Sequence, residues 1–180
     1  MANDRLRKTT RDMVLSLAVI GVPIAVVLAI EPSKPGNPVS AIGPASFQQT
    51  LAAARAAEPF PVLAPHGLAS GWRATSETYQ EPGDGPADWH IGYLAPDGGY
   101  VDLDQTTEPL GDFLRDQGSD ATQGPQVQVG GAYWQFYSGT TPSAFSTVLV
   151  KDNAQYTELV AGNAPLRELE EFAESLTASS

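Results

Sequence analysis

The sequence contains no cysteine. This absence excludes disulfide bonds, thiolate nucleophiles and every zinc or iron–sulfur site that depends on cysteine. Histidine is scarce as well: His66 and His90 are the only two, so any function that needs an imidazole must use one of them. The sequence also has no HExxH pair, no DxDxDG loop and no GxSxG elbow, which are common signatures of metalloproteases, calcium loops and serine hydrolases.

Basic residues are few and unevenly placed. Lysine and arginine number 10 against 21 aspartate and glutamate residues, a net charge of −11. Residues 1–12 hold four of the basic residues and two acidic ones, a charge of +2, whereas residues 13–180 carry −13. A strongly acidic body repels the phosphate backbone of nucleic acids, so we expect no nucleic-acid partner.

Met13–Ile30 is an uncharged run of eighteen residues whose only polar side chain is Ser16. As a helix it would be about 27 Å long, close to the hydrocarbon thickness of a bilayer. It predicts a single transmembrane anchor, and the basic tail before it predicts a cytoplasmic N-terminus with the C-terminal domain outside the cell membrane.

Two alternatives to an anchor are a cleaved signal peptide and a buried core helix. A small-residue cleavage pattern exists at Val39-Ser40-Ala41, but it lies well past the run, which is longer than a usual signal-peptide apolar region. The run is apolar on all faces, which is not typical of a helix packed on one side of a core. The anchor is therefore the favoured interpretation. It divides the chain into a basic tail (1–12), an anchor (13–30), a proline-rich linker (31–45) and a globular domain (46–180).

The globular domain is predicted to be α+β, with an antiparallel sheet built of successive hairpins and covered by a C-terminal helix. Short apolar runs separated by glycine- and proline-rich turns predict strands at Trp72–Tyr79, Trp89–Leu94, Tyr100–Thr106, Gln126–Val129, Ala132–Tyr137, Phe145–Lys151 and Ala154–Ala161. Helices are expected at Ser46–Ala57, Leu110–Gln117 and Pro165–Leu176. In the last helix Leu166, Leu169, Phe172, Ala173 and Leu176 form an apolar side, and we expect its glutamates mostly to face water.

Alternation of apolar and polar residues predicts the strand registers. The loop Ala95–Gly99 should pair Tyr93 with Val101 and Ile91 with Leu103, and place the pair His90 and Asp104 on the opposite, exposed face. A two-residue Gly130-Gly131 turn should pair Val129 with Ala132 and Val127 with Trp134. The consecutive apolar residues Val148–Val150 suggest a central strand buried on both sides.

His90, Asp102 and Asp104 are the best candidates for chemistry, because all three fall on one predicted face of the sheet. A histidine with two carboxylates can hold a divalent metal ion or polarise a water molecule. The favoured interpretation, however, is that these residues simply form the solvated face of a half-exposed sheet, so no catalytic residue and no metal site is predicted. A Ser–His–Asp triad also remains open by residue type, and His66, between Pro65 and Gly67, is expected in a surface turn. No cofactor is expected.

Aromatic residues are concentrated in the predicted strands, where most should pack in the core. Tyr133 and Tyr137 are the exceptions, because alternation places both on the outward face. They form a possible ligand face for a lipid, a glycan or a peptide.

Several motifs resemble one known family. They are Asp12-Met13-Val14-x-Ser16-Leu17 entering the anchor, Pro65-x-Gly67-Leu68-x-x-Gly71-Trp72-Arg73, Trp89-His90-Ile91-Gly92-Tyr93, Tyr100-Val101-x-Leu103-x-Gln105 and the ending Leu169-x-x-Phe172-Ala173-x-Ser175-Leu176. Together they resemble the actinobacterial membrane-anchored proteins of domain of unknown function 4245. The resemblance implies a single-span protein of the cell envelope and transfers no activity.

Sequence and resemblance together favour a membrane-anchored extracytoplasmic domain that acts as a binding or interaction module. Its expected partners are the membrane, through Met13–Ile30, and an envelope protein, lipid or glycan. The alternative is an envelope hydrolase using His90 with Asp102 or Asp104, or a lipid or glycan carrier that uses the outward sheet face.

Overall fold

The computed structural model describes residues 41–83, 85–116, 121–139 and 146–178, all within the unit Val39–Ser180. Among these residues, no helix has the length and apolar character that crossing a membrane requires. The predicted tail and the predicted anchor Met13–Ile30 lie outside the described residues.

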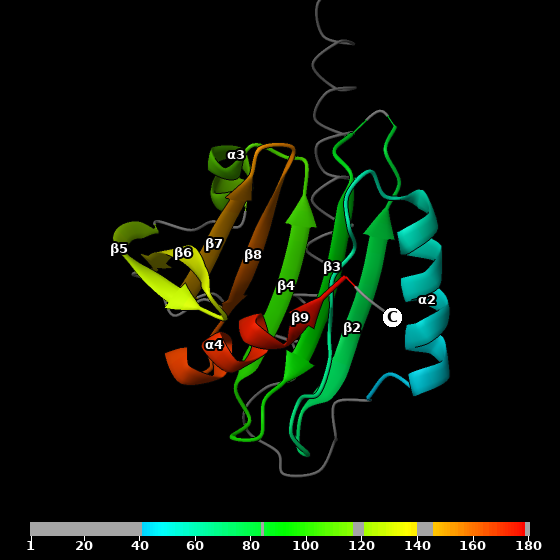
Figure 1. Ribbon diagram of the computed structural model, residues 1–180, viewed down its shortest axis with the longest axis horizontal. Coiled ribbons are helices and arrows are strands. Elements are labelled where there is room, and N and C mark those ends of the chain that lie inside the picture. Colours follow the sequence, from blue (N-terminus) through cyan, green and yellow to red (C-terminus); the bar gives the residue numbers. More distant parts are fainter. Residues whose placement is uncertain (1–40, 84, 117–120, 140–145, 179–180) are drawn as a thin grey trace, which may run out of the picture. The chain divides into compact units, whose positions relative to one another are not determined.

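The described chain folds into three helices and nine strands, two of them very short (Figure 1). The helices are α2 (Pro44–Ala57), α3 (Leu110–Asp116) and α4 (Leu166–Ser175). The strands are β1 (Ala64–Pro65), β2 (Arg73–Gln80), β3 (Asp88–Leu94), β4 (Tyr100–Thr106), β5 (Thr122–Val129), β6 (Ala132–Ser138), β7 (Thr147–Asn153), β8 (Tyr156–Gly162) and β9 (Leu176–Thr177). The predicted α+β class, a largely antiparallel sheet with helices, is confirmed.

Seven strands form one antiparallel sheet in the order β2-β3-β4-β8-β7-β6-β5. The sheet consists of two runs of successive hairpins, β2 to β4 and β5 to β8, and the second run folds back so that its last strand pairs with β4. Successive hairpins were predicted, but the junction between β4 and β8 was not. At this junction the Tyr100 backbone carbonyl lies directly over Gly162, where a Cβ atom would collide with it, so the residue must be glycine.

The registers follow the sequence pattern. Tyr93 pairs with Val101, Ile91 with Leu103 and His90 with Asp104, as predicted. The Gly130-Gly131 hairpin also has the predicted pairs. The β7–β8 hairpin differs: Asp152 and Asn153 continue the strand, and the turn is formed by Ala154 and Gln155, with Ala154 at a φ of 34°.

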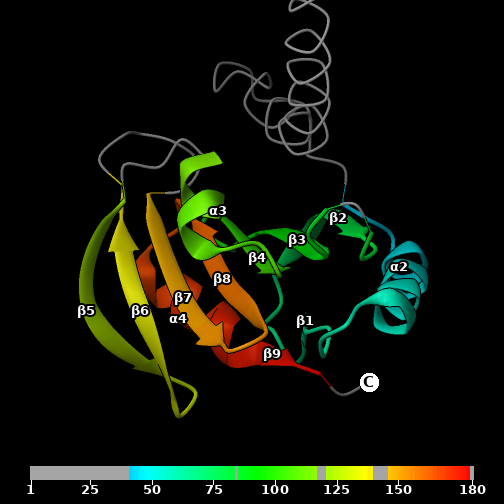
Figure 2. The same ribbon diagram turned by 90° about the horizontal axis from the view of Figure 1, so that it is seen from above.

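Helices α2 and α4 cover the same face of the sheet, and the sheet curves around α4 (Figure 2). A chain of aromatic contacts joins them: Phe47 of α2 meets Tyr93, with ring centroids 6.4 Å apart, and Tyr93 meets Phe172 of α4 at 5.3 Å. Ile91, Leu103, Leu149 and Val160 of the sheet are fully buried in this core. We call this the helix face of the sheet.

Gln105 and Trp89, paired on the helix face, bind the segment before β1. The Gln105 side chain accepts a hydrogen bond from the Leu63 amide at 2.7 Å and donates one to the Pro61 carbonyl at 3.0 Å, and the Trp89 indole donates to the Leu63 carbonyl at 2.9 Å. These bonds fix a proline-containing segment that cannot join the sheet. Beyond it, β1 pairs with β9, a two-stranded contact that the sequence pattern did not predict.

Both flanking helices differ in detail from the prediction. Helix α2 begins at Pro44, two residues before the predicted start at Ser46, with Gly43 at its N-cap, and the Ser46 hydroxyl donates to Glu77 of β2 at 3.0 Å. In α4, Leu169, Phe172 and Ala173 are buried as predicted, but Leu166 is exposed and Glu168 is buried. The helix starts only at Leu166, so its first residue lies beyond the edge of the core.

Phe172→Ala should therefore lower the free energy of unfolding by about 3–5 kcal/mol, since it removes a ring with no exposed area from between Tyr93 and Trp72. Leu166→Ala on the same helix is the matched control and should cost less than about 0.5 kcal/mol. Urea unfolding followed by tryptophan fluorescence measures both. Equal effects of the two substitutions would show that α4 does not close the core.

Candidate functional site

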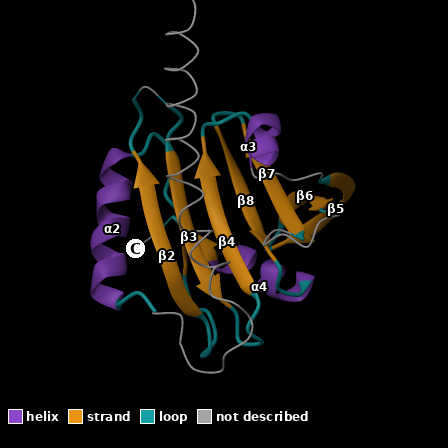
Figure 3. Cartoon of the chain, turned by 180° about the vertical axis from the view of Figure 1, so that it is seen from behind, coloured by secondary structure: helices purple, strands orange, loops and turns teal. Residues whose placement is uncertain are grey.

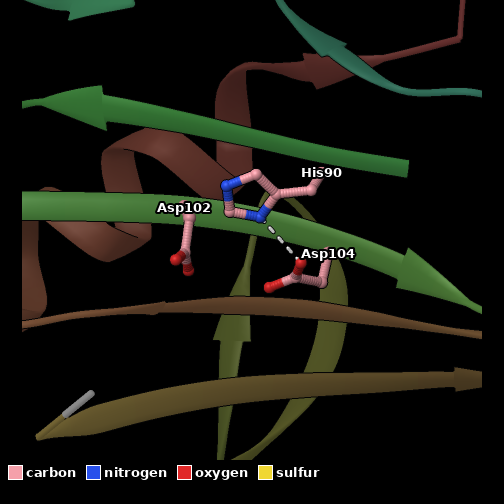
Figure 4. A group of neighbouring side chains, drawn as sticks. All are labelled: His90, Asp102 and Asp104. Carbon is pink, nitrogen blue, oxygen red and sulfur yellow. Dashed lines mark hydrogen bonds and ion pairs between the residues drawn. The ribbon is translucent and has the colours of Figure 1, made fainter. Parts of the chain in front are cut away.

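His90 on β3 and Asp102 and Asp104 on β4 lie together on the face of the sheet opposite the helix face (Figure 4). The pairing of β3 with β4 places His90 directly opposite Asp104, and Asp102 lies two residues earlier on the same side of β4. One ligand atom from each of the three side chains falls within 4.8 Å of the others. The cluster predicted from the sequence is therefore assembled.

The predicted exposure of this cluster was wrong. Asp102 has no exposed area, Asp104 is 6% exposed, and only 17% of the His90 side chain is accessible. On this face the aspartates are flanked by buried residues. The neighbouring strand β8 places Leu159 and Ala161 beside them, and Val148 and Val150 of β7 follow, so the middle of this face is apolar and buried.

A further residue, Ser76, completes a line of hydrogen bonds. His90 Nδ1 lies 2.8 Å from Asp104 Oδ1, and His90 Nε2 lies 3.1 Å from the Ser76 hydroxyl on β2. The sequence pattern did not predict this serine. A register irregularity between Ala74 and Ser76 changes the alternation of the strand, so Ser76 faces the side opposite to the one that simple alternation from Ala74 would give. The serine and the Tyr100 hydroxyl both lie over Gly92, where a Cβ atom would collide with them.

The electrostatics of the cluster are set by burial and by mutual attraction. Burial alone would lower the pKa of His90, but Asp104, through its charge and hydrogen bond, together with Asp102 and Asp88, raises the pKa to about 9. The pKa of Asp102 is well above its ordinary value, mainly because of burial and then because of the negative charge of Asp104. The same two causes raise the pKa of Asp88 to about 7.

The Asp102 carboxylate is incompletely satisfied. The Ala161 amide and the Tyr100 hydroxyl are close enough to lower its pKa, yet neither carboxylate oxygen has a hydrogen-bond partner of good geometry. Both aspartate side chains project to the same side of β4 (Figure 4). Two adjacent carboxylates and an imidazole supply the oxygen and nitrogen donors that divalent metal ions use in proteins. The residues present thus fit a cation.

The sequence comparison gives the family. A family model described as a protein of unknown function, DUF4245, matches residues 5–176. The chain belongs to the DUF4245 family. No curated protein and no solved structure gave a significant match. The matched residues include the whole cluster and also the predicted anchor, so the resemblance inferred from the motifs is confirmed at the level of the family.

The other candidate residues of this DUF4245 domain lie apart from the cluster. His66 is exposed in the loop after β1, beside Glu171 and Glu174 of α4. Tyr133 and Tyr137 lie on β6, where Tyr133 is 67% exposed and Tyr137 is partly buried. The structure brings neither His66 nor the two tyrosines to His90.

Gly92→Ala tests the packing of this site in the DUF4245 domain. The added methyl group must displace Ser76 and Tyr100 and should destabilise the domain by about 1–3 kcal/mol. Gly111→Ala in α3, where nothing lies within 4 Å of the added group, should be neutral or stabilising by up to about 1 kcal/mol. Urea unfolding of both variants gives the comparison, and a neutral Gly92→Ala would contradict the close packing over Gly92.

Proposed function

We propose that the protein is a membrane-tethered domain outside the cytoplasm that binds a divalent cation between His90, Asp102 and Asp104. The observation that carries this proposal is the Asp102 carboxylate, which has no exposed area and no hydrogen bond of good geometry to either oxygen. The proposed function is binding. The cation is either the ligand itself or a bridge between the domain and another ligand.

An unpaired buried carboxylate destabilises the folded domain. Removing an ionised carboxylate from water costs several kcal/mol unless an opposite charge or hydrogen bonds replace the water. His90 offsets the charge of Asp104, because they share a hydrogen bond of 2.8 Å, but Asp102 has no such partner. A divalent cation bound between the two carboxylates would neutralise both, while the imidazole supplies a nitrogen donor. A mixed nitrogen and oxygen set favours Zn²⁺ or Mn²⁺ over Ca²⁺, which prefers oxygen ligands alone.

The tether is supported by the sequence. The uncharged run Met13–Ile30 follows a tail of charge +2, and the family match starts at residue 5, so it includes both the run and most of the tail. Such a protein would hold its cation site outside the membrane, within reach of an envelope protein, lipid or glycan.

A hydrolase is the second candidate, because Ser76, His90 and Asp104 are hydrogen-bonded in the order of a Ser–His–Asp triad. The base in such a triad must accept the serine proton. With its pKa raised to about 9, the His90 imidazole is already protonated at neutral pH and cannot do so. A cation can displace that proton, whereas a serine hydroxyl cannot, and this favours the cation site.

The cation proposal predicts saturable binding of one Zn²⁺ or Mn²⁺ ion by the full chain in detergent micelles, after EDTA treatment, in isothermal titration calorimetry at pH 8. Asp102→Asn should weaken this affinity by at least about tenfold. In the metal-free protein the same substitution should raise the melting temperature, because it replaces a buried, unpaired carboxylate with a neutral group.

Asp112→Asn is the matched control. Asp112 is half exposed and pairs with Arg115 on α3, so its substitution should change neither quantity. Equal affinities of the wild type and Asp102→Asn, or no saturable binding, would refute the cation site. Labelling of Ser76 by a fluorophosphonate probe would support the hydrolase instead.

The tether proposal predicts that a reporter enzyme fused after Ser180 is active only if it functions outside the cytoplasm. The mature protein should also keep Met13–Ile30, which intact-mass measurement can check. A mature N-terminus close to Ile42 would mean that the apolar run is a signal peptide.

A further inference from the structure

The hairpin of β5 and β6 presents a row of tyrosine and glutamine side chains on the face opposite the helix face. Cross-strand pairing sets Gln128 against Tyr133, Gln126 against Gln135 and Gln123 against Tyr137. We call these six residues the Tyr–Gln face. Their strands form the β5 edge of the sheet, which is the edge farther from α2 (Figure 3).

Packing on the helix face explains why these side chains are left outside. Val129 and Trp134, which alternate with them, are 6% and 3% exposed in the core. Tyr133 is 67% exposed, and it is one of only two exposed large hydrophobic residues among those that the structure describes. The three glutamines of β5 are exposed as well. The Tyr133 ring is therefore exposed to solvent, while the next residue, Trp134, packs in the core and fixes the strand.

The charge pattern points to the kind of ligand. Residues 121–150 contain no aspartate, glutamate, lysine, arginine or histidine, although the chain carries 31 charged residues. All six residues of the Tyr–Gln face fall in this segment. An uncharged surface has no group that can form an ion pair with a cation or an anion, and the net negative charge of the protein repels anions, so the ligand that suits this surface is neutral.

The side-chain chemistry narrows the class further. A tyrosine offers a flat apolar ring with a hydroxyl at its tip, and a glutamine offers both donors and an acceptor. A neutral sugar has the matching features, an apolar C–H face edged by hydroxyl groups. A peptide that added a strand would need the free backbone of β5, but Pro125 lacks an amide and the register is irregular between Gln123 and Gln126.

We propose that the Tyr–Gln face binds a neutral oligosaccharide. Tyr133 and Tyr137 are four residues apart along β6, a separation of about 13 Å, so a chain of sugars rather than a single ring would contact both. The site is independent of the proposed cation site: β8 and β7 lie between β4, which carries Asp102 and Asp104, and β6. Its ligand would be a neutral glycan of the envelope or its surroundings.

The test uses the full chain in detergent micelles and a panel of immobilised oligosaccharides, with neutral gluco-, manno-, galacto- and arabino-oligosaccharides beside acidic ones. We expect saturable binding of at least one neutral oligosaccharide and none of the acidic ones. Tyr133→Ala should weaken that binding by about tenfold or more, as for truncation of a central aromatic contact, and Gln128→Ala should weaken it less. EDTA should leave oligosaccharide binding unchanged, so this test succeeds or fails independently of the proposed cation site.

Leu166→Ala is the matched control, since it removes the other exposed large hydrophobic side chain and should not change sugar binding. Tyr133→Phe, which keeps the ring, should retain most of the affinity. Thermal unfolding checks that each variant is folded. We expect the Tyr133 variants to fold, because the Tyr133 side chain lies mostly in water. Failure of the whole neutral panel, equal binding of acidic oligosaccharides, or binding unaffected by Tyr133→Ala would each overturn the proposal.

Discussion

The pairing of β4 with β8 is the contact on which the rest of the domain depends. It joins two runs of hairpins that are far apart in the chain, from Val101 opposite Gly162 to Thr106 opposite Thr157. Because α4 begins shortly after β8, the same pairing brings Phe172 over Tyr93 and so closes the core. It also makes β4 an interior strand. All of its residues from Val101 to Thr106 are buried, although three of them are polar or charged on the side away from the helices.

Burying the aspartates of β4 costs folding free energy, and the surroundings of the two carboxylates differ. Asp104 is paired with His90, which is in turn held by Ser76. Asp102 has only the approach of an amide and a hydroxyl, and its pKa is raised as a consequence. A protein whose core needed only stability would gain from an apolar residue at this position. A carboxylate at this position is the physical reason for proposing a cation site at this point of the sheet.

The same face of the sheet changes character from one end to the other. Near β3 and β4 it holds the buried ionisable cluster, in the middle it is apolar, and on β6 and β5 it becomes polar, aromatic and free of charge. These three zones follow from the residues that each strand adds at the alternate positions. Strands β8 and β7, which are apolar in the middle of this face, separate the two ends.

Local pattern in the sequence was enough to give the strand registers and the helices. A strand period of two, together with short turns, fixed the β3–β4 pairs and the Gly130-Gly131 hairpin, and the helical spacing of Leu169, Phe172 and Ala173 gave the buried side of α4. The same alternation placed His90, Asp102 and Asp104 together on one face. Alternation states which side of a strand a residue occupies, however, and not whether water reaches that side.

Only the tertiary structure decided that this side is buried. The residues that flank the aspartates depend on which strand lies next to β4, and that neighbour is β8, more than fifty residues further along the chain. The apolar run Val148–Val150 predicted a strand buried on both faces, but nothing local connected it to the aspartates. Ser76 was likewise beyond a sequence pattern, because a single register irregularity turns it toward His90. The sequence by itself determined which residues share a face, since that is a property of each strand, whereas the burial and the partners of those residues arise from contacts between distant segments.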